Sequence, residues 1–115
     1  MDEAARDAIF SLGPHIRYVA FASGQSVDLF QREDLVGASE ASSDYFEELL
    51  VNPTALTLLR RRGDLDCRGL RFVSVGYGNF NQVLVETGEG HVSVSVELDA
   101  DPARVAEQVA RVIGR

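Results

Sequence analysis

Cysteine and histidine are the side chains best suited to covalent or metal chemistry, and this chain of 115 residues holds one cysteine and two histidines. Cys67 could act as a nucleophile with His91 as its base, because a neighbouring base activates a thiol. His15, Cys67 and His91 come from three separate segments, however, without the spacing of a zinc site. A lone cysteine also behaves most often as a small apolar side chain. We therefore predict no catalytic residues and no metal site.

Two short motifs look like ligand sites but fit structural roles better. Gly76-Tyr77-Gly78 has glycines spaced as in a nucleotide loop, yet no helix follows whose N-terminus would bind a phosphate. Asp99-Ala100-Asp101 offers two carboxylates, but it stands directly before a helix, where acidic side chains cap free N–H groups. We interpret the first motif as a hairpin turn and the second as a helix cap, and we expect no cofactor.

Polar side chains recur along the strands that we expect in the second half of the chain, and four of them are Tyr77, Asn81, Gln82 and His91. Polar groups gathered in this way could line a pocket for a small molecule. The same pattern is typical of a sheet with one solvated face, on which polar residues alternate with buried apolar ones. We expect the solvated face, with the ligand-binding face as the alternative.

Apolar residues recur every three to four positions in the segments expected to be helical, and they alternate in the segments expected to be strands. The expected helices are Asp2–Leu12, Ser43–Val51, Pro53–Arg62 and one that begins at Asp101-Pro102, and the expected strands are Ile16–Ala22, Gln25–Gln31, Leu70–Tyr77, Phe80–Thr87 and His91–Leu98. Residues 32–41 are polar and small, as in a loop. Together these elements predict an α+β fold with a five-stranded mixed or antiparallel sheet and helices on both faces.

The middle helical segment contains two signals that commonly mark helix boundaries. Asn52-Pro53 has the form of an N-cap followed by a proline in the first helical turn, so we expect the segment to be kinked or broken there. Gly63 is the expected C-terminal cap. The arginines at 60–62 would then lie where the negative end of the helix dipole favours cations.

Composition restricts the class of protein. Hydrophobic residues make up 45% of the chain and charged residues 25%, as in a soluble globular protein, and the length suits a single domain over residues 1–115. The formal net charge is −7, and all 11 basic residues are arginine. An acidic surface disfavours binding to nucleic acid. No apolar run approaches the roughly 20 residues of a membrane helix, so we expect a cytoplasmic protein without membrane insertion.

Charge is distributed unevenly along the middle helical segment. Glu40, Asp44, Glu47 and Glu48 crowd one end, and residues 60–62 place three arginines at the other. Between these ends lie more large apolar side chains than one face of a sheet requires, namely Tyr45, Phe46, Leu49, Leu50, Leu56, Leu58 and Leu59. A segment with opposite charges at its ends is complementary to an antiparallel copy of itself, which favours a homodimer. The alternative is a monomer whose helix suits only its own dipole.

The order of elements and the segment VSVSVELDADPARVAEQV resemble the roadblock/dynein light chain superfamily, whose fold runs α-ββ-α-βββ-α. The resemblance covers nearly the whole chain and fits best over Ile16–Phe30 and Leu70–Ile113. It implies a roadblock/profilin-like sandwich and a homodimer in which the third strands pair edge to edge and the central helices pack together. Pro53 departs from the family's usually continuous central helix. The interface implied in this way comprises Tyr45, Phe46, Leu49, Leu50, Leu56, Leu59, Arg60, Phe72, Val73 and Val75.

The resemblance also implies a function. Members of the superfamily are non-catalytic adaptors and regulators, and bacterial and archaeal members commonly act on small Ras-like GTPases through the face of the central helix. Our first hypothesis is therefore a non-enzymatic, homodimeric interaction module that regulates a small GTPase. The alternative is a small-molecule-sensing domain that uses Tyr77, Asn81, Gln82 and His91, and an enzyme using Cys67 ranks last.

Overall fold

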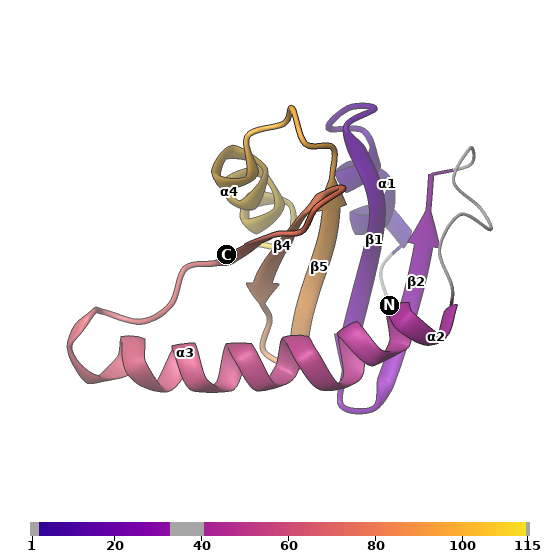
Figure 1. Cartoon of the computed structure of the whole chain (residues 1–115). Coiled ribbons are helices and arrows are strands. Elements are labelled where there is room, and N and C mark those ends of the chain that lie inside the picture. The colour runs from indigo at the N-terminus through magenta and orange to yellow at the C-terminus, as the bar shows by residue number, and fades with distance from the viewer. Residues whose placement is uncertain (1–2, 33–40, 115) are drawn as a thin grey trace.

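The computed structural model describes residues 3–32 and 41–114, so most of the expected loop at 32–41, with Glu40, lies outside the described residues. The elements are α1 (Glu3–Phe10), β1 (Ile16–Ser23), β2 (Ser26–Gln31), α2 (Ala41–Phe46), η2 (Glu47–Val51), α3 (Asn52–Asp66), β3 (Val73–Gly76), β4 (Asn81–Glu86), β5 (Gly90–Val96) and α4 (Pro102–Val112). The segments α2, η2 and α3 follow one another without a break, and we call them together the central helix (Figure 1).

The sheet has the strand order β2-β1-β5-β4-β3, and all four strand pairings are antiparallel. Helices α1 and α4 cover one face, and the central helix crosses the other (Figure 1). The expected α+β fold with helices on both faces is thus confirmed, with a purely antiparallel sheet. The third strand begins at Val73 rather than at the expected Leu70, and it lies at the edge of the sheet.

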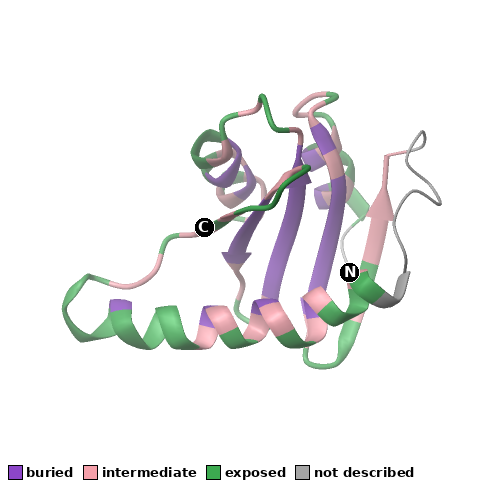
Figure 2. Ribbon diagram, viewed as in Figure 1, coloured by how far each residue is buried: buried purple, intermediate pink, exposed green. Residues whose placement is uncertain are grey.

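The apolar core lies between the sheet and the pair α1 and α4. It includes Ile9 of α1, Val105 and Val109 of α4, and the side of the strands on which Val94 lies. Figure 2 shows β1, β4 and β5 as the most continuously buried part of the fold. Each valine that is fully buried here contributes roughly 1.5–3 kcal/mol to the free energy of folding. The helical stripe predicted for α1 and the alternation predicted for β5 therefore build this core.

Pro53 does not break the central helix, so of the two expected outcomes the gap is wrong. The backbone N–H of Asn52 donates to the carbonyl of Glu47, five residues earlier, which makes η2 a π-helical turn. A proline inside a helix lacks an N–H and its ring crowds the carbonyl one turn back. The wider π turn directly before Pro53 relieves that crowding, so the chain continues as a helix.

Gly63 does not end α3, and this expectation is also wrong. The helix runs on to Asp66, and the chain reverses through Arg68 and Gly69, whose φ angles are 63° and 93°. Gly63 is buried inside α3, where an added Cβ would lie 2.7 Å from the carbonyl oxygen of Gly69. Glycine is needed here because the returning chain touches the helix backbone. The arginines at 60–62 consequently precede the last turn of α3 instead of forming it.

The outer side of the central helix is the most exposed part of the fold. The C-terminal half of α3 extends past the strands, and Figure 2 shows it almost entirely exposed. Among the described residues, no helix combines the length and the apolar character needed to cross a lipid bilayer.

Candidate functional site

The side of the sheet that faces the central helix is polar and buried. His91, Ser93 and Ser95 alternate with the core valines of β5, so all three point toward the central helix, as does Gln82 of β4. Each of the four is at most 5% exposed. The solvated face expected from the sequence is therefore wrong, because the helix covers polar strand residues that alternation alone would place in water.

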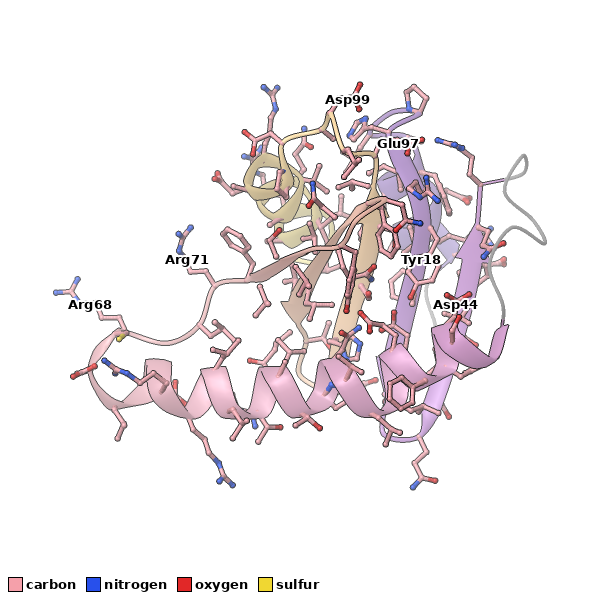
Figure 3. All side chains as sticks on the ribbon, in the orientation of Figure 1. Tyr18, Asp44, Arg68, Arg71, Glu97 and Asp99 are labelled. Atoms are coloured by element: carbon pink, nitrogen blue, oxygen red, sulfur yellow. The ribbon has the colours of Figure 1, made fainter. Side chains whose placement is uncertain are left out.

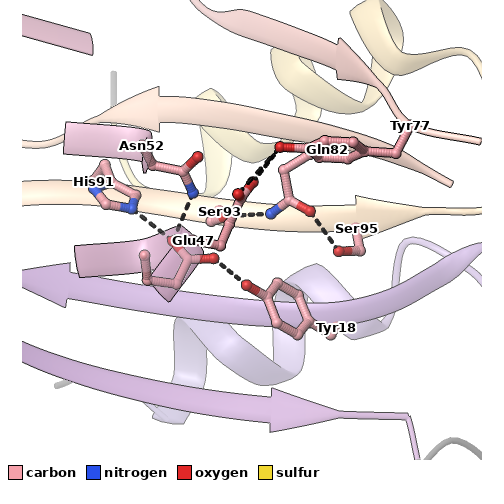
Figure 4. Close-up of polar contacts among 9 residues, drawn as sticks. Tyr18, Glu47, Asn52, Tyr77, Gln82, His91, Ser93 and Ser95 are labelled. Atoms are coloured by element: carbon pink, nitrogen blue, oxygen red, sulfur yellow. Dashed lines mark hydrogen bonds and ion pairs between the residues drawn. The ribbon is translucent and has the colours of Figure 1, made fainter. Parts of the chain in front are cut away.

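The π turn directs a carboxylate into this covered space. Glu48 is 0% exposed, and its Oε1 accepts hydrogen bonds from His91 Nε2 at 2.7 Å and from Asn52 Nδ2 at 2.9 Å. Its Oε2 accepts from the hydroxyl of Tyr18 on β1. Figure 4 shows these contacts joining helix and strands. Asn52 thus anchors a buried carboxylate through its side chain and has helical backbone angles, so the N-cap expected there is wrong.

The electrostatics of this cluster favour an ionised Glu48. Burial alone would raise the pKa of Glu48, but the hydrogen bonds from His91, Tyr18 and Asn52 outweigh it and hold that pKa below its usual value. Burial, and then the nearby Glu48 charge, raise the pKa of Tyr18 well above that of a free phenol. The Tyr18 phenol therefore stays protonated and remains a hydrogen-bond donor to Glu48.

A second polar network lies beside the first. The amide of Gln82 donates to the hydroxyl of Ser93, and the hydroxyl of Ser95 donates to Gln82 Oε1 at 2.7 Å (Figure 4). Among the described residues, no buried side-chain nitrogen or oxygen lacks a hydrogen-bond partner. The buried polar layer is thus internally satisfied, which makes it a means of holding the helix on the sheet in one register.

Two further contacts connect the central helix to the sheet. The hydroxyl of Tyr77, in the turn between β3 and β4, donates to both carboxylate oxygens of Glu47, at 2.9 and 3.1 Å. Arg60 of α3 forms an ion pair with Glu86 at the end of β4. Burial is the main cause that raises the pKa of Glu47 above its usual value. Burial also raises the pKa of Tyr77 to about 12.

The residues suited to nucleophilic chemistry do not come together. Cys67 is exposed just after α3, and its thiol donates to Asp66, which is the main cause of a raised thiol pKa. His91 is buried against Glu48 on β5. Within the described part of the chain, no group of three or more histidine, cysteine or acidic side chains is placed to bind a metal ion.

The predicted ligand face divides into two environments. Gln82 and His91 are buried under the central helix, whereas Asn81 is half-buried and Tyr77 is exposed at the edge. Tyr77 and Gln82 also line a cleft of about 680 Å³ between the start of the central helix and the turn from β3 to β4. The cleft lacks Asn81 and His91, so sequence alone identified only part of its lining.

The predicted interface divides in a similar way. Tyr45, Phe46, Leu50 and Leu59 are exposed on the central helix, and Leu49 is half-buried. On and just before the edge strand β3, Phe72, Val73 and Val75 are half-buried. Arg60 is exposed and paired with Glu86.

Three corrections concern this surface. Leu56 is 3% exposed, so it packs inside the subunit and is no contact for a partner. Glu48 is also buried, so it adds no charge to the exposed acidic end of the helix. Leu65 is the most exposed of the large apolar side chains, at 79%, and it was missed because we expected the helix to end before it.

No protein-family model and no curated protein matches the chain. Solved structures share its fold, among them these two. A Roadblock/LC7 domain from Streptomyces avermitilis has a TM-score of 0.70 and 15% identity, over 94% of this chain and 88% of that one. MglC from Myxococcus xanthus has a TM-score of 0.56 and 18% identity, over 93% of this chain and 88% of that one. The chain therefore has the roadblock fold, as the resemblance of its sequence implied.

Proposed function

We propose that this protein is a non-catalytic, cytoplasmic interaction module that forms a homodimer and regulates a small Ras-like GTPase. The observation that carries the proposal is the exposed apolar side of the central helix. Large apolar side chains lie there in water along its whole length, at Tyr45, Phe46, Leu50, Leu58, Leu59 and Leu65. So many large apolar side chains exposed on one helix favour a site of protein association.

The edge of the sheet supports the same proposal. β3 pairs with β4 on one side only, and Val73 and Val75 are half-buried on it. An edge strand that carries apolar side chains invites pairing with another strand. Pairing of two β3 strands would continue the sheet across a twofold axis, as the family resemblance implies. The GTPase partner rests on that resemblance together with the shared roadblock fold.

The oligomeric state can be measured with a double variant, Leu58→Asp with Leu65→Asp. Both side chains are more than 60% exposed, so the aspartates cost little in a monomer but place charges inside a dimer interface. We expect a dimer for the wild type and a monomer for the double variant by analytical ultracentrifugation. Leu98→Asp is the matched control, because Leu98 is 57% exposed but lies beyond β5, away from the central helix. A monomeric wild type, or a double variant that stays dimeric, would contradict the proposed dimer.

The GTPase partner needs a separate experiment. Wild-type protein is immobilised and incubated with lysate of its native host. The lysate is loaded beforehand with either GDP or a non-hydrolysable GTP analogue. The bound proteins are then identified by mass spectrometry. We expect a small GTPase whose retention depends on the nucleotide, reduced on the Leu58→Asp/Leu65→Asp bait and kept on Leu98→Asp. The GTPase proposal fails if no GTP-binding protein is retained in either state.

A further inference from the structure

The cleft beside the π turn has the shape and lining of a small-molecule site. Its walls come from α2 and η2, from the start of β1 and from the turn between β3 and β4. Phe46, Val51 and Phe80 supply apolar surface, and the ring of Tyr77 packs 5.3 Å from that of Phe80. A concave site of about 680 Å³ that combines apolar surface with polar and charged side chains is typical of a pocket for a small ligand.

The polar side chains at the base of the cleft already have hydrogen-bond partners, so they offer a ligand no unpaired donor. Gln82 and Ser95 bond to each other there, and Tyr18 bonds to Glu48 (Figure 4). The charged side chains that line the cleft are Asp44, Glu47 and Arg17. Figure 3 shows Asp44 directed from the helix toward the side of the sheet that carries Tyr18.

The wall charges favour a cation. Arg17 bonds to Glu97 at 2.8 Å and lies over the ring of Phe80, so its charge is already compensated. Glu47, in contrast, accepts hydrogen bonds from Tyr77 alone among the described residues, and no arginine of that part of the chain contacts it. The acids of the neighbouring sheet edges, Glu86 and Glu97, both have arginine partners. Glu47 is therefore a half-buried carboxylate of this cleft that forms no ion pair with an arginine of the described residues.

We propose that this cleft binds a small organic cation, through an ammonium or guanidinium group that pairs with Glu47 and contacts the rings of Tyr77 and Phe80. A cation beside a carboxylate forms a charge-assisted hydrogen bond, and aromatic faces attract the same charge. The raised pKa of Glu47 agrees with a carboxylate that lacks such a partner. Phe46 lines this cleft and also belongs to the exposed apolar side of the central helix, but Glu47, Tyr77 and Phe80 do not, so the proposal goes beyond the proposed function.

The test uses benzamidine as the probe, with benzyl alcohol and benzoate as its neutral and anionic counterparts. Each is titrated into the nitrogen-15-labelled full chain and followed by amide chemical shifts. We expect benzamidine to shift amides around Tyr77 and Glu47 with a measurable Kd, and to bind at least about tenfold more tightly than the other two. Equal affinities for the three probes, or benzamidine shifts confined to other regions, would overturn the proposal.

Two variants make the test specific to Glu47. Glu47→Gln keeps an oxygen that can accept from Tyr77 but removes the charge, so benzamidine should bind about tenfold more weakly. Glu89→Gln, at an exposed position in the turn between β4 and β5, removes the same charge elsewhere and should leave the Kd unchanged. Amide dispersion like that of the wild type shows that each variant is folded. Equal weakening by both variants would refute a role for Glu47.

The pH dependence is a readout that a purely structural role would not produce. The titratable or charged groups around Glu47 are Asp44 and Glu48 on the central helix, Tyr77 on the turn, His91 on β5 and Arg17 on β1. Because the pKa of Glu47 is raised, benzamidine affinity should increase as pH rises through that pKa, and Glu47→Gln should abolish the increase. A pH-independent wild-type Kd would contradict the pairing.

Two sources could supply such a cation, and both can be compared. Agmatine carries the guanidinium on a free small molecule, whereas a capped Gly-Arg-Gly peptide carries it on a protein backbone. Tighter binding of agmatine identifies a metabolite as the source, and tighter binding of the peptide identifies an arginine of another protein. Failure of both to bind would overturn the proposal. The Leu58→Asp/Leu65→Asp variant should bind the cation as the wild type does, which separates this result from the oligomeric state.

Discussion

Replacing Glu48 by glutamine tests the central feature of this fold, a buried carboxylate that holds the helix on a polar sheet face. Glutamine has the shape of glutamate but lacks the charge, and an NH2 group that donates replaces one of the two accepting oxygens. In the wild type that carboxylate accepts from His91, Asn52 and Tyr18. The variant keeps the volume and changes only the chemistry of these three bonds.

The expected loss follows from the number of bonds. A hydrogen bond to a charged group contributes about 1.5–3 kcal/mol, and a neutral one about 0.5–1.5 kcal/mol, so each bond weakens by roughly 1 kcal/mol. A neutral amide is easier to bury than a carboxylate, which offsets part of this loss. We expect Glu48→Gln to lower the free energy of unfolding by about 2 kcal/mol at pH 7. For a domain of this size that corresponds to a fall in Tm of roughly 8 °C.

The neighbouring Glu47 provides a matched control, because its pKa is shifted in the direction opposite to that of Glu48. The folded-state pKa of Glu47 is raised. Its contribution to the free energy of unfolding is therefore fully present below the unfolded-state pKa and is lost as pH rises through the folded-state pKa. Glu48 has a lowered folded-state pKa, so its contribution is present above the unfolded-state pKa and is lost as pH falls through the folded-state value. At pH 7, Glu47→Gln should therefore change stability by less than about 0.5 kcal/mol or increase it.

The measurement is urea unfolding followed by circular dichroism, for both variants and the wild type, from pH 7 down to pH 3. The difference between the wild type and Glu48→Gln should shrink as pH falls below the ordinary pKa of a glutamate, because the unfolded chain then takes up a proton that the folded state, with its lowered Glu48 pKa, resists. The reasoning is refuted if Glu48→Gln is as stable as the wild type at pH 7, or if Glu47→Gln is the more damaging variant.

Two further predictions concern single positions. Gly63→Ala should lower the free energy of unfolding by about 1–3 kcal/mol, because its new Cβ meets the backbone of Gly69. Gly88→Ala is the control and should not lower it, because the space around Gly88 is open. Urea unfolding measures both variants. The phenol of Tyr77 should ionise at about 12, and a spectrophotometric titration of Tyr77→Phe against the wild type isolates its absorbance change. An ionisation near 10 for that group would contradict its partial burial and its contact with Glu47.

The strands and the outer helices were predictable because their signals are local. Alternation with period two identified β5, and the apolar stripe identified α4, to within a few residues. The exposed apolar side of the central helix was also foreseen in part, since Phe46 and Leu50 exceed what one sheet face can cover. Pro53 and Gly63 each follow a general rule for helix ends, and neither ends the helix. Gly63 is overridden by the returning backbone of Gly69, and Pro53 is accommodated by the π turn that directly precedes it.

What the sequence determined by itself was the order of elements and the alternation of apolar side chains, because both depend on residues a few positions apart. Only the tertiary structure decided which polar side chains are buried. Glu48 and His91 are 43 residues apart in the chain, and their contact exists because the central helix crosses β5. Alternation places a polar residue on one face of a strand. Whether water or a helix covers that face depends on the whole fold. The buried polar layer and the cleft beside it are therefore properties of the assembled structure.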